Sequence, residues 1–169
     1  KAISITCDAQ NELMKVLRPD MKEYQAEAVV EAVFKMNGAE YPGYPSIVGA
    51  GENSCVLHYI NNDKANIQNQ LILMDLGAEY KGYTADVTRT IPVNGKFTEE
   101  QKKIYEIVYD AQEAGIKMAK KGNSFSDIYE ATKSVIIDGL MKLEILKDPE
   151  NYRDYFPHGV AHHIGLDVH

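Results

Sequence analysis

The sequence from residue 71 to residue 91 reads LILMDLGAEYKGYTADVTRTI. Its apolar beginning and its β-branched end are typical of two strands, and the polar residues between them are typical of a turn. A turn centred between Tyr80 and Lys81 would set Asp75 directly opposite Asp86, with Cβ atoms about 5 Å apart on one sheet face. We therefore predict an antiparallel hairpin that carries two facing carboxylates.

Two carboxylates in this setting need a physical explanation. An ionised aspartate within an apolar strand costs several kcal/mol unless it is paired, hydrogen-bonded or bound to a cation. Two buried like charges also repel, and one of them would take up a proton. Divalent cations between Asp75 and Asp86 would remove this conflict, and two cations about 3.5 to 4 Å apart fit a bridging carboxylate. Alternatively, Asp86 pairs with Arg89 or a backbone turn while Asp75 stays protonated, and the hairpin alone leaves both readings open.

Histidines gather at the end of the chain, where residues 158–169 read HGVAHHIGLDVH and hold four of the five histidines. Imidazole binds transition metals and transfers protons near neutral pH, so we predict a functional role for at least one of the four. The glycines and Pro157 disfavour a long helix, and we expect an extended or looped segment. His58 lies alone in the first half, in the segment CVLHYI (55–60), whose composition predicts a strand. A lone strand histidine is more often structural than catalytic.

The rest of the pattern predicts an α+β protein. A length of 169 residues favours one domain with one core. Apolar residues at helical spacing predict four helices, a first that ends before Arg18-Pro19, a second that ends at Asn37-Gly38, a third that follows the capping box Thr98–Gln101, and a fourth from about Ser126.

Composition excludes several classes of protein. The formal net charge of -7 leaves no basic stripe for a phosphate backbone, so we expect no nucleic-acid partner. No apolar run reaches the roughly 18 residues that span a bilayer, and the first residues lack the pattern of a signal peptide. Cys7 and Cys55 are too few for a disulfide framework. We therefore expect a soluble, cytoplasmic protein that acts on a small or peptide substrate and binds no membrane.

Three segments in order carry a resemblance to a known family. They are GAGENSCVLHY (49–59), LILMDLGAEYKGYTADVTRTIPVNGKFT (71–98) and HGVAHHIGLDVH (158–169). Together they resemble the metallopeptidases of the creatinase or "pita-bread" fold, and among these most of all aminopeptidase P, the Xaa-Pro aminopeptidases. The resemblance covers essentially the whole chain. It implies a partial pita-bread fold of the α+β class, in which helices pack on one face of an antiparallel sheet.

The resemblance also implies a metal site. Asp75 matches the family's first aspartate ligand, Asp86 the aspartate that bridges both metals, and His162 the histidine ligand. Thr88 matches a residue that supports the bridging aspartate. The implied cofactor is a pair of divalent cations, with manganese expected first and cobalt or zinc as alternatives.

Further histidines match residues that handle the substrate. His58 and His169 match the histidines that contact the substrate and the tetrahedral intermediate. The resemblance therefore favours a catalytic role for His58, although a lone strand histidine is more often structural. His158 matches a histidine that lines the proline pocket, whereas His163 has no such counterpart and is expected to be structural. The implied reaction is hydrolysis of the bond between an N-terminal residue and a following proline, by a hydroxide that bridges the two metals.

The family pattern continues beyond the last residue of this sequence. Its members carry two more glutamate ligands on later strands, and aminopeptidase P has an amino-terminal domain before the catalytic one. We therefore expect residues 1–169 to be a single, truncated catalytic domain with an incomplete metal site, which binds metal weakly and does not turn over. The expected partner of the parent enzyme is a peptide with proline in second position, and a homo-oligomeric parent is left open.

Two other functions compete with this one. Prolidase, which cleaves only Xaa-Pro dipeptides, shares the same motifs. Some pita-bread domains have lost their metal ligands and serve as binding modules without catalysis. The module is disfavoured because this chain retains the ligand residues Asp75, Asp86 and His162.

Overall fold

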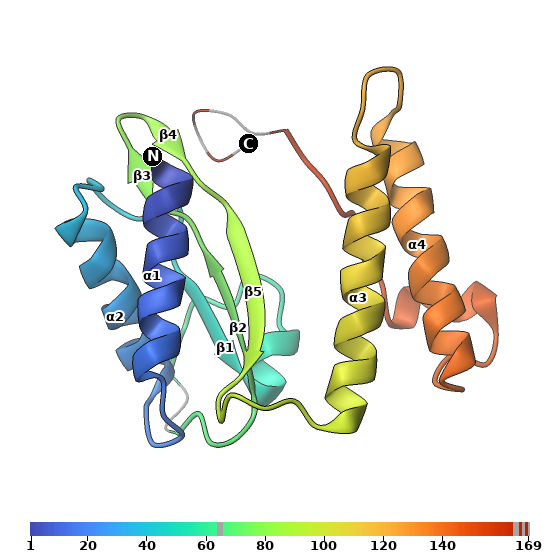
Figure 1. The fold of residues 1–169 in the computed structure, drawn as a ribbon, viewed down its shortest axis with the longest axis horizontal. Helices are drawn as coiled ribbons and strands as arrows, with labels where there is room; N and C mark the ends of the chain where they lie inside the picture. The colour runs from blue at the N-terminus through green and yellow to red at the C-terminus, as the bar shows by residue number, and fades with distance from the viewer. Residues whose placement is uncertain (64–65, 164–165, 167, 169) are drawn as a thin grey trace. The chain divides into compact units, whose positions relative to one another are not determined.

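The computed structural model describes residues 1–63, 66–163, 166 and 168. They form two compact units, the first built mainly from residues 1–96 and the second from residues 97–163 (Figure 1). Each unit has its own cluster of buried apolar side chains. Chain length predicts one core, but the described residues form two apolar clusters. The second cluster is separate because the helices of the second unit bury their apolar faces against each other. That the two units form one catalytic domain stays a prediction.

The first unit is a three-stranded antiparallel sheet, ordered β1-β2-β5, with two helices and a short hairpin. It contains, in chain order, α1 (Ala2–Val16), α2 (Glu23–Met36), β1 (Ile47–Ala50), the 3-10 turn η1 (Gly51–Cys55), β2 (Leu71–Leu76), β3 (Glu79–Tyr80), β4 (Tyr83–Thr84) and β5 (Val87–Pro92). The first two predicted helices are thereby confirmed.

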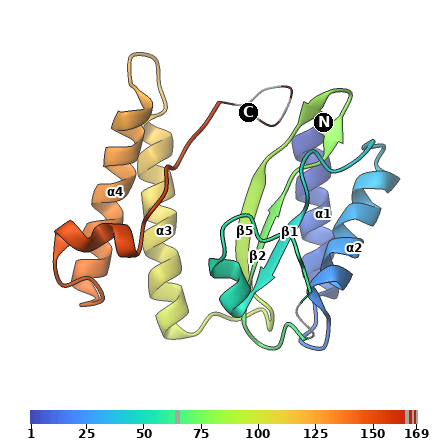
Figure 2. The same cartoon turned by 180° about the vertical axis from the view of Figure 1, so that it is seen from behind.

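The central strand β2 separates the two faces of the sheet. Ile72, Met74 and Leu76 are fully buried and belong to the same apolar cluster as Ile5 of α1 and Phe34 of α2. Successive side chains of a strand point to opposite faces, so Asp75 points away from these helices. Figures 1 and 2 show α1 and α2 on one face of the sheet and the η1 turn on the other. The predicted packing of helices on one sheet face is confirmed.

The predicted register of the hairpin is wrong. The turn is made by Lys81 and Gly82, which both have left-handed φ values, 54° and 85°. Two such residues form the tight turn whose twist suits a two-residue hairpin loop. The hairpin is therefore centred one residue later than predicted, and Asp75 pairs with Thr88 rather than with Asp86.

The strand predicted over residues 55–60 is also absent. The η1 turn ends at Cys55, and residues 56–60 form a turn and an irregular segment. His58 has a φ of 52°, in the left-handed region that an extended strand does not use. The segment doubles back because side chains on both sides of it bond to one buried carboxylate, that of Glu23.

The second unit contains α3 (Glu99–Met118), α4 (Phe125–Lys142) and the 3-10 turn η2 (Pro149–Asp154). Both long helices confirm the sequence prediction, and both begin with a capping box, at Thr98 and at Ser124. The helices approach closely where a Cβ atom on Gly139 would lie 2.7 Å from the side chain of Ile107. Among the described residues, no helix is long and apolar enough to cross a bilayer.

The cap of α4 yields a stability prediction. The Ser124 hydroxyl accepts a hydrogen bond from the backbone N–H of Asp127 and so satisfies one free donor of the first helical turn. Ser124→Ala is expected to lower the free energy of unfolding by about 1 kcal/mol, as loss of such a cap usually does. Urea titration measures this change. Ser126→Ala, an exposed position in the same turn, is the matched control, and equal stability of the two variants would contradict the prediction.

Candidate metal centre

The two aspartates of the hairpin meet at a third residue, Tyr44. The Tyr44 hydroxyl lies 2.7 Å from Oδ1 of Asp75 and 3.2 Å from Oδ1 of Asp86. Asp75 is half-buried and Asp86 is exposed, so the two carboxylates are not both buried in an apolar setting. Their convergence holds nevertheless, because both oxygens lie within hydrogen-bond distance of one hydroxyl group.

Tyr44 acts as a neutral donor in this arrangement. Burial, followed by the hydrogen bond to Asp75 and the charges of both aspartates, raises the pKa of Tyr44 far above its usual value. The hydroxyl therefore keeps its proton and can donate it to only one carboxylate at a time. Arg89, considered as a partner of Asp86, donates from Nη1 to the carbonyl oxygen of Thr88 at 2.7 Å.

The position of Tyr44 depends on glycine at position 77. The Gly43 N–H donates to the carbonyl oxygen of Gly77 at 2.7 Å, and Pro42 pairs with Ala78. A Cβ atom on Gly77 would lie 2.6 Å from Cε1 of Tyr44 and 2.0 Å from the carbonyl oxygen of Ala85. Only a residue without a side chain allows the Tyr44 ring to reach the carboxylates here. Sequence reasoning missed Tyr44, since it identified this segment only as non-helical.

Thr88 and His58 are the other predicted site residues of the first unit. Thr88 is exposed and lies directly across from Asp75 in the β2–β5 pairing, so the two side chains share one sheet face. His58 is exposed and lies in the turn that follows η1.

Three of the predicted histidines lie in the irregular segment at the end of the second unit. His162 places Nδ1 2.6 Å from the carbonyl oxygen of His163. A carbonyl oxygen only accepts, so Nδ1 is the donor and a neutral His162 ring carries its lone pair on Nε2. The His163 ring meets Phe125 edge-on at 4.9 Å between centroids, a contact that suits its expected structural role.

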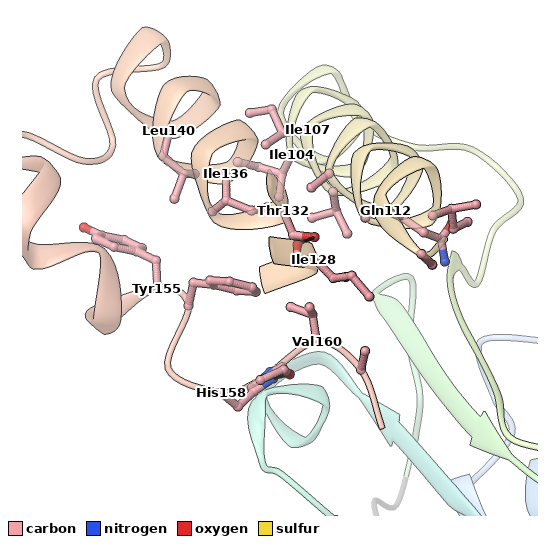
Figure 3. Close-up of a pocket in the computed structure, with 18 of the residues that line it drawn as sticks. Ile104, Ile107, Gln112, Ile128, Thr132, Ile136, Leu140, Tyr155, His158 and Val160 are labelled. Atoms are coloured by element: carbon pink, nitrogen blue, oxygen red, sulfur yellow. Dashed lines mark hydrogen bonds between the residues drawn. The ribbon is translucent and has the colours of Figure 1, made fainter. Parts of the chain in front are cut away.

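His158 lines an apolar cavity of the second unit. The cavity has a volume of about 780 Å³, and side chains of α3 and α4 form most of its wall. Figure 3 shows His158 and Val160 on one side of it and the isoleucines of the two helices on the other. The His158 ring also lies 5.9 Å from that of Phe156, which stacks on Tyr129.

The structure thus brings together two of the three predicted metal ligands. Asp75 and Asp86 converge in the first unit, whereas His162 belongs to the second. Within residues 1–63, 66–163, 166 and 168, no three His, Cys, Asp or Glu side chains are grouped so that they could hold a cation. His169 lies outside the described residues.

Comparison with known proteins decides the family. The model of a family described as metallopeptidase family M24 matches residues 1–169. This chain belongs to that family. Relatives include the Xaa-Pro aminopeptidases of Escherichia coli K12, 42% identical, and of Haemophilus influenzae, 38% identical. Each match covers 100% of this chain but only 40% and 41% of the relative, so the chain spans about two fifths of their length.

Solved structures agree with the family assignment. Pseudomonas aeruginosa aminopeptidase PepP has a TM-score of 0.92 and 40% identity, over 99% of this chain and 40% of that one. Zinc-substituted Escherichia coli aminopeptidase P in complex with product has a TM-score of 0.91 and 41% identity, over 98% of this chain and 39% of that one. The predicted partial pita-bread fold of the α+β class is therefore confirmed.

Proposed function

We propose that this chain is the metal-holding part of an Xaa-Pro aminopeptidase, which hydrolyses the bond between an N-terminal residue and a following proline. The observation that carries the proposal is the convergence of Asp75 and Asp86 on one hydroxyl. It occurs in a chain that is similar along its whole length to Xaa-Pro aminopeptidases.

The chemistry of these residues fits a divalent cation. Carboxylate oxygens suit manganese, and a neutral imidazole suits manganese, cobalt or zinc, so Asp75, Asp86 and His162 would hold the metal. We propose that the cofactor would be a pair of divalent cations, with manganese expected first. When bound, they would lower the pKa of water and polarise the scissile carbonyl group. Tyr44 and Thr88 would then orient the carboxylates, as residues around a metal site commonly do.

The histidines would act on the substrate. His58 and His169 would orient the peptide and donate hydrogen bonds to the oxyanion that develops at the scissile carbonyl. The apolar cavity beside His158 supports a role for this residue in receiving the proline ring. The role of His169 rests on its match to the family motif alone.

The chain supplies an incomplete site in this proposal. It spans about 40% of its relatives, and the remaining ligands would belong to sequence that they possess beyond this span. Residues 1–169 on their own are therefore expected to bind metal weakly and to show no turnover.

A peptide series tests the function. The full-length protein, loaded with Mn²⁺, is expected to cleave Xaa-Pro-Yaa and to leave Xaa-Ala-Yaa intact, and removal of the metal with EDTA should abolish cleavage. Cleavage of Xaa-Pro dipeptides alone would indicate prolidase. Peptide binding without any cleavage would indicate a binding module, and either result would overturn the proposal.

Metal affinity tests the role of Tyr44. Tyr44→Phe keeps the ring and removes the hydroxyl that lies within hydrogen-bond distance of both Asp75 and Asp86. Loss of such a supporting bond typically lowers metal affinity by about 10- to 100-fold, and we expect this change for Mn²⁺ by isothermal titration calorimetry. Tyr41→Phe, at a 58% exposed tyrosine in the same loop, is the matched control. Equal affinity in the two variants would show that Tyr44 does not support the site.

We also propose a cytoplasmic protein without nucleic-acid or membrane partners. Cys7 and Cys55 are both free thiols, which suits a reducing compartment. The net charge of -7 disfavours binding to nucleic acid or an anionic membrane surface.

A further inference from the structure

A buried carboxylate lies at the start of α2, away from the two aspartates. Glu23 is fully buried, and its oxygens accept hydrogen bonds from the backbone N–H of Ala50 at 2.8 Å and from the Tyr59 hydroxyl at 2.7 Å. Asn53 donates from Nδ2 to the same carboxylate at 3.0 Å. A buried carboxylate is tolerated when several donors surround it. All three donors come from one short stretch, residues 50–59.

Two of these donors, Asn53 and Tyr59, join the two ends of an exposed loop, because both bond to Glu23. Asn53 and Tyr59 stand on either side of residues 55–58, which are exposed, and Nδ2 of Asn53 also lies 2.8 Å from the Tyr59 hydroxyl. The backbone N–H of Asp63 reaches that hydroxyl at 3.2 Å. Burial, and then the bond to Glu23, raise the pKa of Tyr59, so the hydroxyl stays a neutral donor. Oδ1 of Asp63 also lies 2.8 Å from that hydroxyl, so hydrogen bonds to Glu23 and Asp63 join the two ends of the exposed loop.

The loop lies on the sheet face that carries Asp75. Gly49 pairs with Leu73, which is two residues from Asp75 and therefore points to the same face. A Cβ atom on Gly49 would be only 3.0 Å from the backbone of Asn53, so the η1 turn crosses the sheet at this point. His58 follows in the left-handed conformation, which is uncommon for a non-glycine residue.

We propose that Glu23, Asn53 and Tyr59 form a positioning cluster that fixes the His58 loop over the face of Asp75. The cluster acts through His58 and does not itself touch substrate, and its catalytic consequence rests on the proposed peptidase function. Its structural consequence is independent of that function. A fixed loop would keep the imidazole where it can donate to the oxyanion without rearrangement during the reaction.

Hydrogen exchange tests the anchoring of the loop. Tyr59→Phe removes one hydroxyl from the cluster, and Tyr24→Phe, on the exposed side of α2, is the matched control. The amides of Ala50 and Val56 are hydrogen-bonded within this region, and in Tyr59→Phe we expect them to exchange about tenfold faster. Unchanged exchange relative to the control overturns the proposal, whether or not the protein is a peptidase.

A double-mutant cycle tests the link to His58 in the full-length, Mn²⁺-loaded protein. Tyr59→Phe is expected to lower kcat about tenfold with little change in KM, because the loss falls on transition-state stabilisation. In a His58→Ala background, the same change should alter kcat/KM less than twofold. A tenfold fall in both backgrounds would show that the cluster does not act through His58. Absence of Xaa-Pro cleavage in the wild-type protein would refute the proposed function. Hydrogen exchange would then still test whether the cluster anchors the loop.

Discussion

Replacing Asp86 with asparagine in the full-length, Mn²⁺-loaded protein is expected to lower kcat/KM for an Xaa-Pro peptide by about 10³-fold or more. The asparagine keeps the size of the side chain, and its amide oxygen can still accept a hydrogen bond from the Tyr44 hydroxyl. It removes only the negative charge. In the proposed site Asp86 would be one of the residues that hold the cations, so loss of its charge would weaken the centre. Metal ions contribute several kcal/mol to transition-state stabilisation, and about 4 kcal/mol corresponds to 10³-fold in rate.

The control for this variant is another aspartate-to-asparagine change. Asp20 is exposed and forms an ion pair with Arg18 at 3.3 Å in the loop before α2, so Asp20→Asn should leave kcat/KM within about twofold. The change at Asp86 should also reduce the number of bound Mn²⁺ ions. Near-normal kcat/KM and metal content in Asp86→Asn would exclude Asp86 as a ligand.

Replacing Phe34 with alanine is expected to lower the free energy of unfolding by about 3 to 5 kcal/mol, as removal of a buried aromatic ring does. Phe34 is 2% exposed and belongs to the cluster that supports the helix-facing side of β2. The change would leave a cavity beneath the strand that carries Asp75, so stability and the metal site should weaken together. Urea titration of the full-length protein measures the loss.

Met36 provides the comparison on the same helix. Its side chain is 76% exposed, so Met36→Ala should change the free energy of unfolding by no more than about 0.5 kcal/mol. A loss in Phe34→Ala that is no larger than this would mean that the apolar cluster under the sheet does not stabilise the first unit.

The sequence predicts the convergence of the aspartates even though it misplaces the turn. Moving the hairpin centre by one residue shifts the pairing by two positions, and a shift of two keeps every side chain on its own sheet face. Asp86 therefore remains on the side of Asp75 as a diagonal neighbour, within reach of a long side chain such as Tyr44. The turn was misplaced because the left-handed conformation shared by Lys81 and Gly82 is not evident from composition.

Contacts between distant segments are what local patterns do not predict. Tyr44 reaches Asp75 across 31 positions, and Tyr59 reaches Glu23 across 36. Neither tyrosine lies in a periodic pattern that would indicate a polar partner. The predicted strand over 55–60 was wrong for the same reason, because bonds to Glu23 outweigh the strand propensity of its apolar residues. Helices α1 to α4 were predictable because their apolar spacing and end signals are local.

Asp75 and Asp86 are proposed to hold a divalent cation. The most direct measurement is a crystal structure of the full-length protein grown with Mn²⁺, with diffraction recorded at the manganese absorption edge. We predict anomalous density within coordination distance of both carboxylates, with the Tyr44 hydroxyl still in contact with at least one of them. Density at another place, or no density beside the two carboxylates in saturating Mn²⁺, would show that Asp75 and Asp86 do not hold the cation.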